Sequence, residues 1–202
     1  MQIRKTARTQ LPPDYREIFS VDLMKNKRQI YLVNGLAILI TLAMAIPMHF
    51  YIPVTSLFGM DDLWELWRLG ALVVLSIGYI MLHELVHGMT MKLCGTKKVK
   101  YGYKVVYACA GSDDYYPKGS YILIALAPVV LWGVVIGIIN CFVSVTWFWV
   151  VYILQITNLS GAAGDLYVTF RFLKLPGDIL IRDSGTTMKV YSHTEVSSKN
   201  VS

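Results

Sequence analysis

Residues 78–90 read GYIMLHELVHGMT and place two histidines and a glutamate inside an otherwise apolar run. The run covers residues 66–93, and about 20 helical residues are enough to cross a hydrocarbon core ~30 Å thick. Ionisable side chains are costly at that depth, so a spanning helix that carries them marks a functional site by default. The stretch therefore predicts a membrane helix that carries chemistry.

The composition agrees with a membrane protein. The 202-residue chain is 55% hydrophobic and 16% charged, whereas soluble domains are about 25% charged. Three further apolar segments reach spanning length, at residues 30–52, 121–143 and 147–173. We therefore expect an all-α membrane protein with four transmembrane helices and a small cytoplasmic β element.

Basic residues are distributed unevenly among the segments that flank the spans. The N-terminal segment, the loop 95–119 and the C-terminal tail are rich in lysine and arginine, whereas the other two loops are acidic (Asp61, Asp62, Glu65) or uncharged. The positive-inside rule then places both termini and the loop 95–119 in the cytoplasm. The net charge of +6 reflects this topology, so we do not expect nucleic-acid binding.

Three parts follow from this topology. Residues 1–28 form a basic cytoplasmic segment, in which residues 14–26 are either a short amphipathic helix on the inner leaflet or a solvated tail. Residues 29–174 form the four-span membrane domain, with a β-prone loop at 95–119 that contains KVKYGYKVVYACAG. Residues 175–202 form a cytoplasmic tail, and two β-prone runs on either side of residues 183–185 favour a hairpin there.

The HELVH sequence has the spacing of a zinc site. On a helix, His83 and His87 lie one turn apart on the same face and can bind one Zn²⁺. Glu84 can reach a water molecule that the metal activates, take its proton and later pass it to the leaving amine. The alternative is that both histidines are neutral and hydrogen-bonded within the helix bundle.

A catalytic zinc site usually takes a third protein ligand. Asp165 is the only acidic residue of the four apolar segments besides Glu84. With a rise of about 1.5 Å per residue, His83 and Asp165 lie at similar depths, roughly 25 Å and 27 Å from the outer ends of their spans. Asp165 can instead be a helix-end residue paired with Arg171 or a lysine. Other candidates on the same side are His193, Asp113 and Asp114.

Asn158 lies two turns before Asp165 on roughly the same helical face. A buried amide there can hold a substrate backbone or steady an oxyanion, and an interhelical packing hydrogen bond is the alternative. The small residues between them, Ser160 and Gly164 among them, allow close helix packing in lipid. Cys94, Cys109 and Cys141 are odd in number and lack CxxC spacing, so we expect free thiols.

The motifs together resemble a known family. HELVH in one span, a β-prone loop, a further span and then NLSGAAGDL (residues 158–166) resemble the site-2 protease clan of intramembrane zinc metalloproteases. They look more closely like the zincin-peptidase family of bacterial membrane proteins. The resemblance covers residues 66–173 and implies a three-helix catalytic core plus one added span. It implies His83, His87 and Asp165 as zinc ligands and Glu84 as the catalytic base.

One departure from the clan concerns the fourth span. Site-2 proteases typically carry Asn, then proline, then Leu-Asp-Gly, whereas here a Gly/Ala run follows Asn158 and Leu166 follows Asp165. The proline unwinds the helix locally, and glycines allow the same less firmly. The resemblance therefore carries the metal ligands over better than it carries Asn158 or the handling of substrate.

Two functions from different classes fit these residues. The first is an intramembrane zinc metalloprotease of the cell membrane that cuts a membrane or membrane-proximal protein substrate near the cytoplasmic leaflet. The second is a non-proteolytic zinc-binding membrane protein that acts as a structural or regulatory partner. Glu84 favours the first, because a structural zinc site has no use for a general base. The sequence leaves the substrate and the oligomeric state open.

Overall fold

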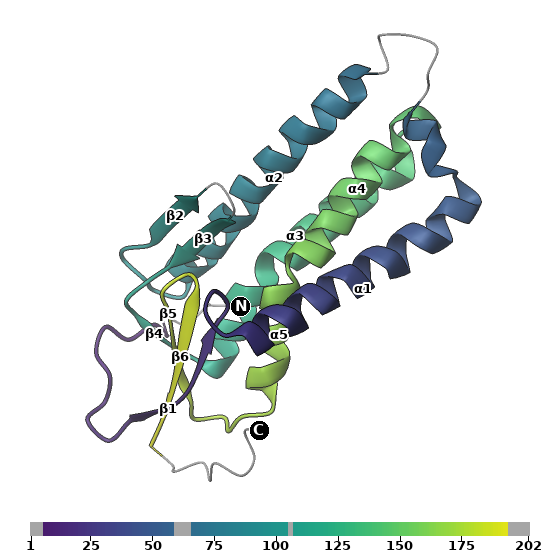
Figure 1. Ribbon diagram of the computed structural model, residues 1–202. Coiled ribbons are helices and arrows are strands. Elements are labelled where there is room, and N and C mark those ends of the chain that lie inside the picture. Colours follow the sequence, from purple (N-terminus) through teal and green to yellow (C-terminus); the bar gives the residue numbers. More distant parts are fainter. Residues whose placement is uncertain (1–5, 59–65, 105–106, 194–202) are drawn as a thin grey trace. The chain divides into compact units, whose positions relative to one another are not determined.

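The structure, a computed structural model, describes residues 6–58, 66–104 and 107–193. In this part of the chain, three helices are long and apolar enough to cross a membrane: α1 (Lys27–Tyr51), α2 (Leu66–Leu93) and α3 (Lys118–Phe142). They correspond to the first three predicted spans (Figure 1). Six residues of the topology prediction lie outside the described residues: Arg4, Lys5, Asp61, Asp62, Glu65 and Lys199.

The fourth predicted span is not one helix. The chain forms α4 (Val145–Gly161) and α5 (Ala163–Leu173), and the helix is interrupted at Ala162, whose φ and ψ are −83° and 14°. Glycine costs about 1 kcal/mol relative to alanine in a helix interior, so Gly161 weakens the helix where it breaks. The expectation of a continuous helix over 147–173 is therefore wrong, and the count of four spans stays a prediction.

The chain divides into two compact units. The first comprises residues 1–31, 84–127 and 165–202, and the second comprises residues 32–83 and 128–164. The boundaries fall inside α1, α2, α3 and α5, the last of them between Gly164 and Asp165. Each unit has its own apolar core, and each is described separately below.

A four-stranded antiparallel sheet belongs to the first unit. Its strand order is β1–β6–β5–β4, with β1 at Arg16–Asp22, β4 at Tyr115–Pro117, β5 at Leu180–Asp183 and β6 at Thr187–Ser192 (Figure 1). Cα partners include Val21 with Met188 and Tyr116 with Ile181. The sheet brings the N-terminal segment, the loop after α2 and the tail together.

The N-terminal strand corrects one expectation. Neither an amphipathic helix nor a solvated tail occupies residues 14–26, because β1 pairs with β6 along its length. The chain then turns into α1: the Asp22 carboxylate accepts the backbone N–H groups of Met24 and Lys25. The Asn26 side chain accepts the N–H of Gln29 at 3.3 Å, as a helix N-cap does.

The hairpin predicted in the tail is present, and the β-prone loop after α2 forms a second one. β5 and β6 pair through the turn predicted at residues 183–185, where Gly185 has a φ of +100°, a conformation that glycine adopts without steric cost. In the loop after α2, β2 (Lys100–Lys104) pairs with β3 (Tyr107–Gly111) as a separate two-stranded sheet. Small sheets therefore accompany the helices, as expected, although their placement in the cytoplasm stays a prediction.

The core of the first unit lies between its sheet and its helices. Side chains from α2, α3 and α5 pack with the strands; the largest fully buried ones are Tyr116, Tyr121, Phe172, Met91 and Ile124. A second cluster, in the other unit, packs Leu57, Trp149 and Val150 together. There, buried Arg68 donates hydrogen bonds to the carbonyls of Ser56 and Thr146, and these stabilise its buried charge.

Gly111→Ala should destabilise the first unit. An added methyl group would lie 2.6 Å from the nitrogen of Gly185 and 2.6 Å from the carbonyl carbon of Ser184, and both are backbone atoms. We expect a loss of about 1–3 kcal/mol, as overpacking typically gives, measured as a lower melting temperature in detergent. Gly177→Ala is the control, since a methyl group there meets nothing within 4 Å. Equal melting temperatures for the two variants would contradict the packing described.

Candidate metal centre

Helix α2 carries His83, Glu84 and His87 near its C-terminal end. His83 and His87 are buried, each with 8% of its surface exposed, and Glu84 between them is partly buried. Residues four apart on a helix lie on one face, and the residue after the first is displaced by about 100°. The helix alone therefore aligns the two imidazoles and leaves the glutamate beside them.

Asp165 lies in the first turn of α5 and belongs to the same unit as His87. Its Oδ2 is 3.6 Å from Nε2 of His87. Zinc bonds of about 2.0–2.2 Å in tetrahedral geometry place two ligand atoms roughly 3.4 Å apart. The measured separation is thus longer than a hydrogen bond and fits two atoms that share one ion.

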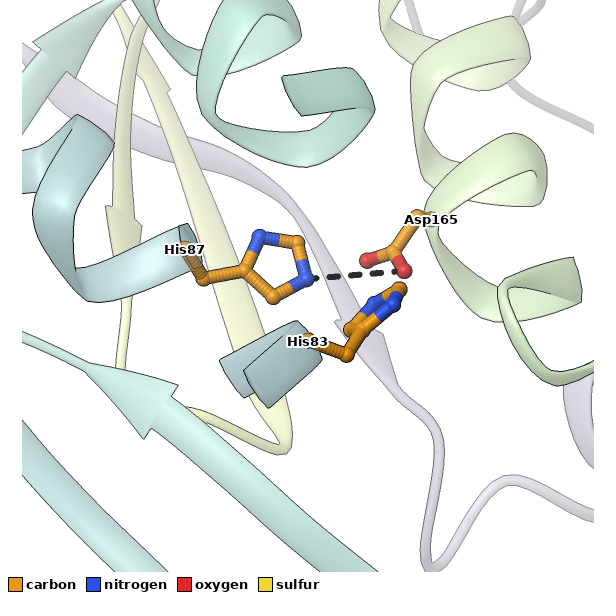
Figure 2. Close-up of side chains that lie close together, drawn as sticks. All are labelled: His83, His87 and Asp165. Carbon is orange, nitrogen blue, oxygen red and sulfur yellow. Dashed lines mark ion pairs between the residues drawn. The ribbon is translucent and has the colours of Figure 1, made fainter. Parts of the chain in front are cut away.

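His83 completes the group, because it precedes His87 by one turn of the same continuous helix. One ligand atom from each of His83, His87 and Asp165 lies within 4.8 Å of the others, the one such group of three found among the described residues (Figure 2). Two imidazole nitrogens and one carboxylate oxygen are a donor set of catalytic zinc sites, which leave a fourth position open. The residues present therefore fit zinc; their role as ligands stays a prediction.

The weaker ligand candidates lie elsewhere. Asp113 is exposed and accepts hydrogen bonds from Lys100 and Arg182, which lower the pKa of its carboxyl group. Nδ1 of His193 lies 2.7 Å from Oδ2 of Asp178. Asp114 is not part of the group either. None of the three cysteines is in a disulfide, as expected.

Both histidines use Nδ1 for a hydrogen bond inside the protein. Nδ1 of His87 lies 2.9 Å from the carbonyl oxygen of Ile124 in α3, and Nδ1 of His83 lies 2.9 Å from the hydroxyl of Tyr79. Such outer contacts orient metal-ligating imidazoles. In each ring the nitrogen left for a metal is therefore Nε2.

Asn158 is fully buried in α4. Its Oδ1 accepts the hydroxyl proton of Tyr79 at 2.8 Å, and its Nδ2 donates to the carbonyl of Val129 at 3.1 Å. These two hydrogen bonds are contacts of the kind that the packing alternative for this residue expects. The expectation that Asn158 and Asp165 lie on one continuous helix is wrong, because the break at Ala162 separates their helices. That they share a face stays a prediction.

Sequence reasoning missed Tyr79 and Ile124. Tyr79 had a visible signal, since Tyr79, His83 and His87 recur at intervals of four residues and so line one face of α2. Gly88, next to His87, also went unnoticed. A methyl group there would overlap the hydroxyl oxygen of Tyr101, so the phenol occupies the space of the missing side chain.

The two buried histidines of HELVH and the nearby Asp165 have the spacing and donor types that zincin-type metal sites use. The chain belongs to the family described as "Putative zincin peptidase", which matches residues 76–180, just over half of the chain. The matched range contains His83, Glu84, His87 and Asp165. The name of the family suggests a metallopeptidase, and the word zincin implies zinc as the metal.

The chain is also similar to a curated protein, "Uncharacterized 24.7 kDa protein in gap 5'region" of Pyrococcus woesei. The two are 32% identical over 123 residues, which are 58% of this chain and 53% of the relative. The chain thus spans about half the length of the curated relative it matches. No solved structure matches it.

Proposed function

We propose that this protein is an intramembrane zinc metalloprotease that hydrolyses peptide bonds of a membrane or membrane-proximal protein near the cytoplasmic leaflet. One observation carries the proposal: the group of His83, His87 and Asp165 includes two residues of α2, a helix long and apolar enough to cross a membrane. A soluble zincin has no need of such a helix around its metal ligands.

The residues divide the chemistry between them. His83, His87 and Asp165 would hold the zinc ion, which when bound polarises the scissile carbonyl and lowers the pKa of the attacking water. Glu84 takes the proton of that water and later gives it to the leaving amine. Burial of both histidines limits access of bulk water to this chemistry.

The proposed resemblance to site-2 proteases gains support from the break at Ala162. In that clan a proline opens the helix that carries the aspartate; here α4 ends and α5 begins without one, two residues before Asp165. The Gly/Ala run therefore supplies the interruption that the missing proline would have supplied. The proposal thus includes three further points: membership of the site-2 protease clan, cleavage on the cytoplasmic side, and a site surrounded by the lipid bilayer.

The proposal is tested with purified protein in proteoliposomes. The probes are a labelled single-span peptide with a Gly-Pro pair in its apolar segment and an unfolded soluble protein of similar size. We expect cleavage of the spanning peptide, loss of cleavage in a zinc chelator, and recovery on addition of one equivalent of zinc.

The other outcomes separate the alternatives. Cleavage of the soluble protein alone would indicate a zincin that acts on cytoplasmic peptides, and would overturn the intramembrane assignment. A zinc-loaded protein that cuts neither probe, nor any of a panel of spanning peptides, would favour the non-proteolytic zinc-binding role.

A further inference from the structure

We infer that Pro128 and the pair Tyr79–Asn158 are positioning residues that hold both metal-binding histidines with the proton on Nδ1 and Nε2 toward the ion. The inference rests on the proposed zinc site and adds three residues to it. It follows from tracing each hydrogen bond back to a group that can act only as an acceptor.

The first trace starts at Pro128, which lies inside α3. A proline has no N–H, so it cannot donate to the carbonyl four residues earlier in a helix, which is that of Ile124. This carbonyl oxygen accepts a bond from Nδ1 of His87 at 2.9 Å. Because a carbonyl cannot donate, Nδ1 of His87 must carry the proton.

The second trace starts at the carbonyl of Val129, also an acceptor only. It lies 3.1 Å from the Asn158 side chain, so the amide must turn its Nδ2 toward it and its Oδ1 away. Oδ1 then accepts the single hydroxyl proton of Tyr79 at 2.8 Å.

That hydrogen bond settles the second histidine. With its proton given to Asn158, the hydroxyl of Tyr79 can only accept from Nδ1 of His83, 2.9 Å away. Nδ1 of His83 is thus protonated as well, and its Nε2 lone pair is left for the metal. Buried Asn158 acts through Tyr79 and need not touch substrate.

Both traces begin in α3, at the carbonyls of Ile124 and Val129, on either side of Pro128. Because Pro128 has no N–H, the carbonyl of Ile124 is available as an acceptor, whereas in an ordinary helix it would accept the N–H four residues later. The helix loses one backbone hydrogen bond at this carbonyl, and the hydrogen bond from the histidine replaces it.

The experiment measures the zinc-loaded protein with ¹⁵N-histidine labelling, and zinc affinity by competition with a chromophoric chelator. In the wild type we expect two zinc-bound Nε2 signals and two protonated Nδ1 signals. Tyr79→Phe and Pro128→Ala should each weaken zinc binding about 10–100-fold, as loss of an outer contact to a ligand typically does.

Two matched controls separate positioning from damage. Tyr152→Phe loses a hydroxyl that donates to the carbonyl of Met44, and Pro47→Ala replaces the proline inside α1. Neither should change zinc affinity. Pro128→Ala also restores an N–H to α3, so its melting temperature should not fall while its zinc affinity does.

The outcomes are separable from those of the proposed function. Zinc bound through Nδ1, or unchanged affinity in both variants, overturns the inference and leaves the protease proposal standing. Zinc bound through Nε2 without any cleavage overturns the protease proposal alone. A wild-type protein that binds no zinc overturns both.

Discussion

Asp165→Ala is expected to release the zinc ion from the purified protein. The carboxylate supplies the one oxygen of the group, 3.6 Å from Nε2 of His87, and an alanine leaves two imidazoles to hold the ion. Loss of an outer contact already costs 10–100-fold in affinity, so loss of a direct ligand should cost more than about 100-fold. Metal analysis after dialysis should fall from one zinc per chain to nearly none.

A control and a contrary result sharpen this test. Asp113→Ala removes an exposed carboxylate that pairs with Lys100 and Arg182 and lies outside the metal group, so its zinc content should not change. A full equivalent of zinc in Asp165→Ala would show that another group is the third ligand. It would leave Asp165 as an acidic residue that favours the N-terminus of α5 through the helix dipole.

Glu84→Gln should keep the zinc ion and lose cleavage. Glutamine has the same size but cannot take a proton from water, and general-base catalysis contributes about 10²–10⁴ in rate. Glu84 is not one of the three grouped ligands, so the affinity for zinc should change little. The measurements are initial rates on the spanning peptide and zinc content of the same sample.

Glu17→Gln is the matched control, because this exposed carboxylate on β1 pairs with Lys189 and lies on the sheet. Its rate should equal that of the wild type. Full activity in Glu84→Gln would exclude a role as the base. Loss of zinc together with activity would instead make Glu84 part of the ligand set.

The apolar helices could be read from the sequence because their signal is local. The predicted segment 66–93 has the same bounds as α2, whereas α1 and α3 each begin three residues before the predicted spans. An apolar segment ends where charged residues such as Lys27, Arg28 and Lys118 begin, but the backbone hydrogen bonds of a helix continue through them. The aliphatic parts of such side chains can lie along a helix while the charge reaches water.

Two features could not be read because they depend on distant contacts. β1 pairs with β6, more than 160 residues later, and a strand gains its stability from that partner. The break at Ala162 depends on a difference of about 1 kcal/mol per glycine, which packing easily outweighs. The sequence still indicates Asp165 as a ligand candidate, because the scarcity of acidic residues in the apolar segments does not depend on a continuous helix.

The hydrogen bonds around the histidines could be predicted only in part from the sequence. The spacing of Tyr79, His83 and His87 is visible in the sequence, as is the interval of four between Ile124 and Pro128. That Ile124 faces His87 is a matter of tertiary packing, which no spacing encodes.

The four-stranded sheet has a consequence for how often the chain crosses the membrane. A hydrogen-bonded sheet lies on one side of a bilayer, so β1, β4, β5 and β6 share a side. The number of crossings between any two of these strands must then be even. Between β1 and β4, α1 and α2 make such a pair.

The same parity applies between β4 and β5, where the chain runs through α3, α4 and α5. If α3 crosses, the chain must return before Leu180, and α4 with α5 is the stretch left to do it. The return can therefore be made by two shorter helices. The requirement for an even number of crossings comes from the sheet alone and depends neither on the distribution of lysines nor on hydropathy.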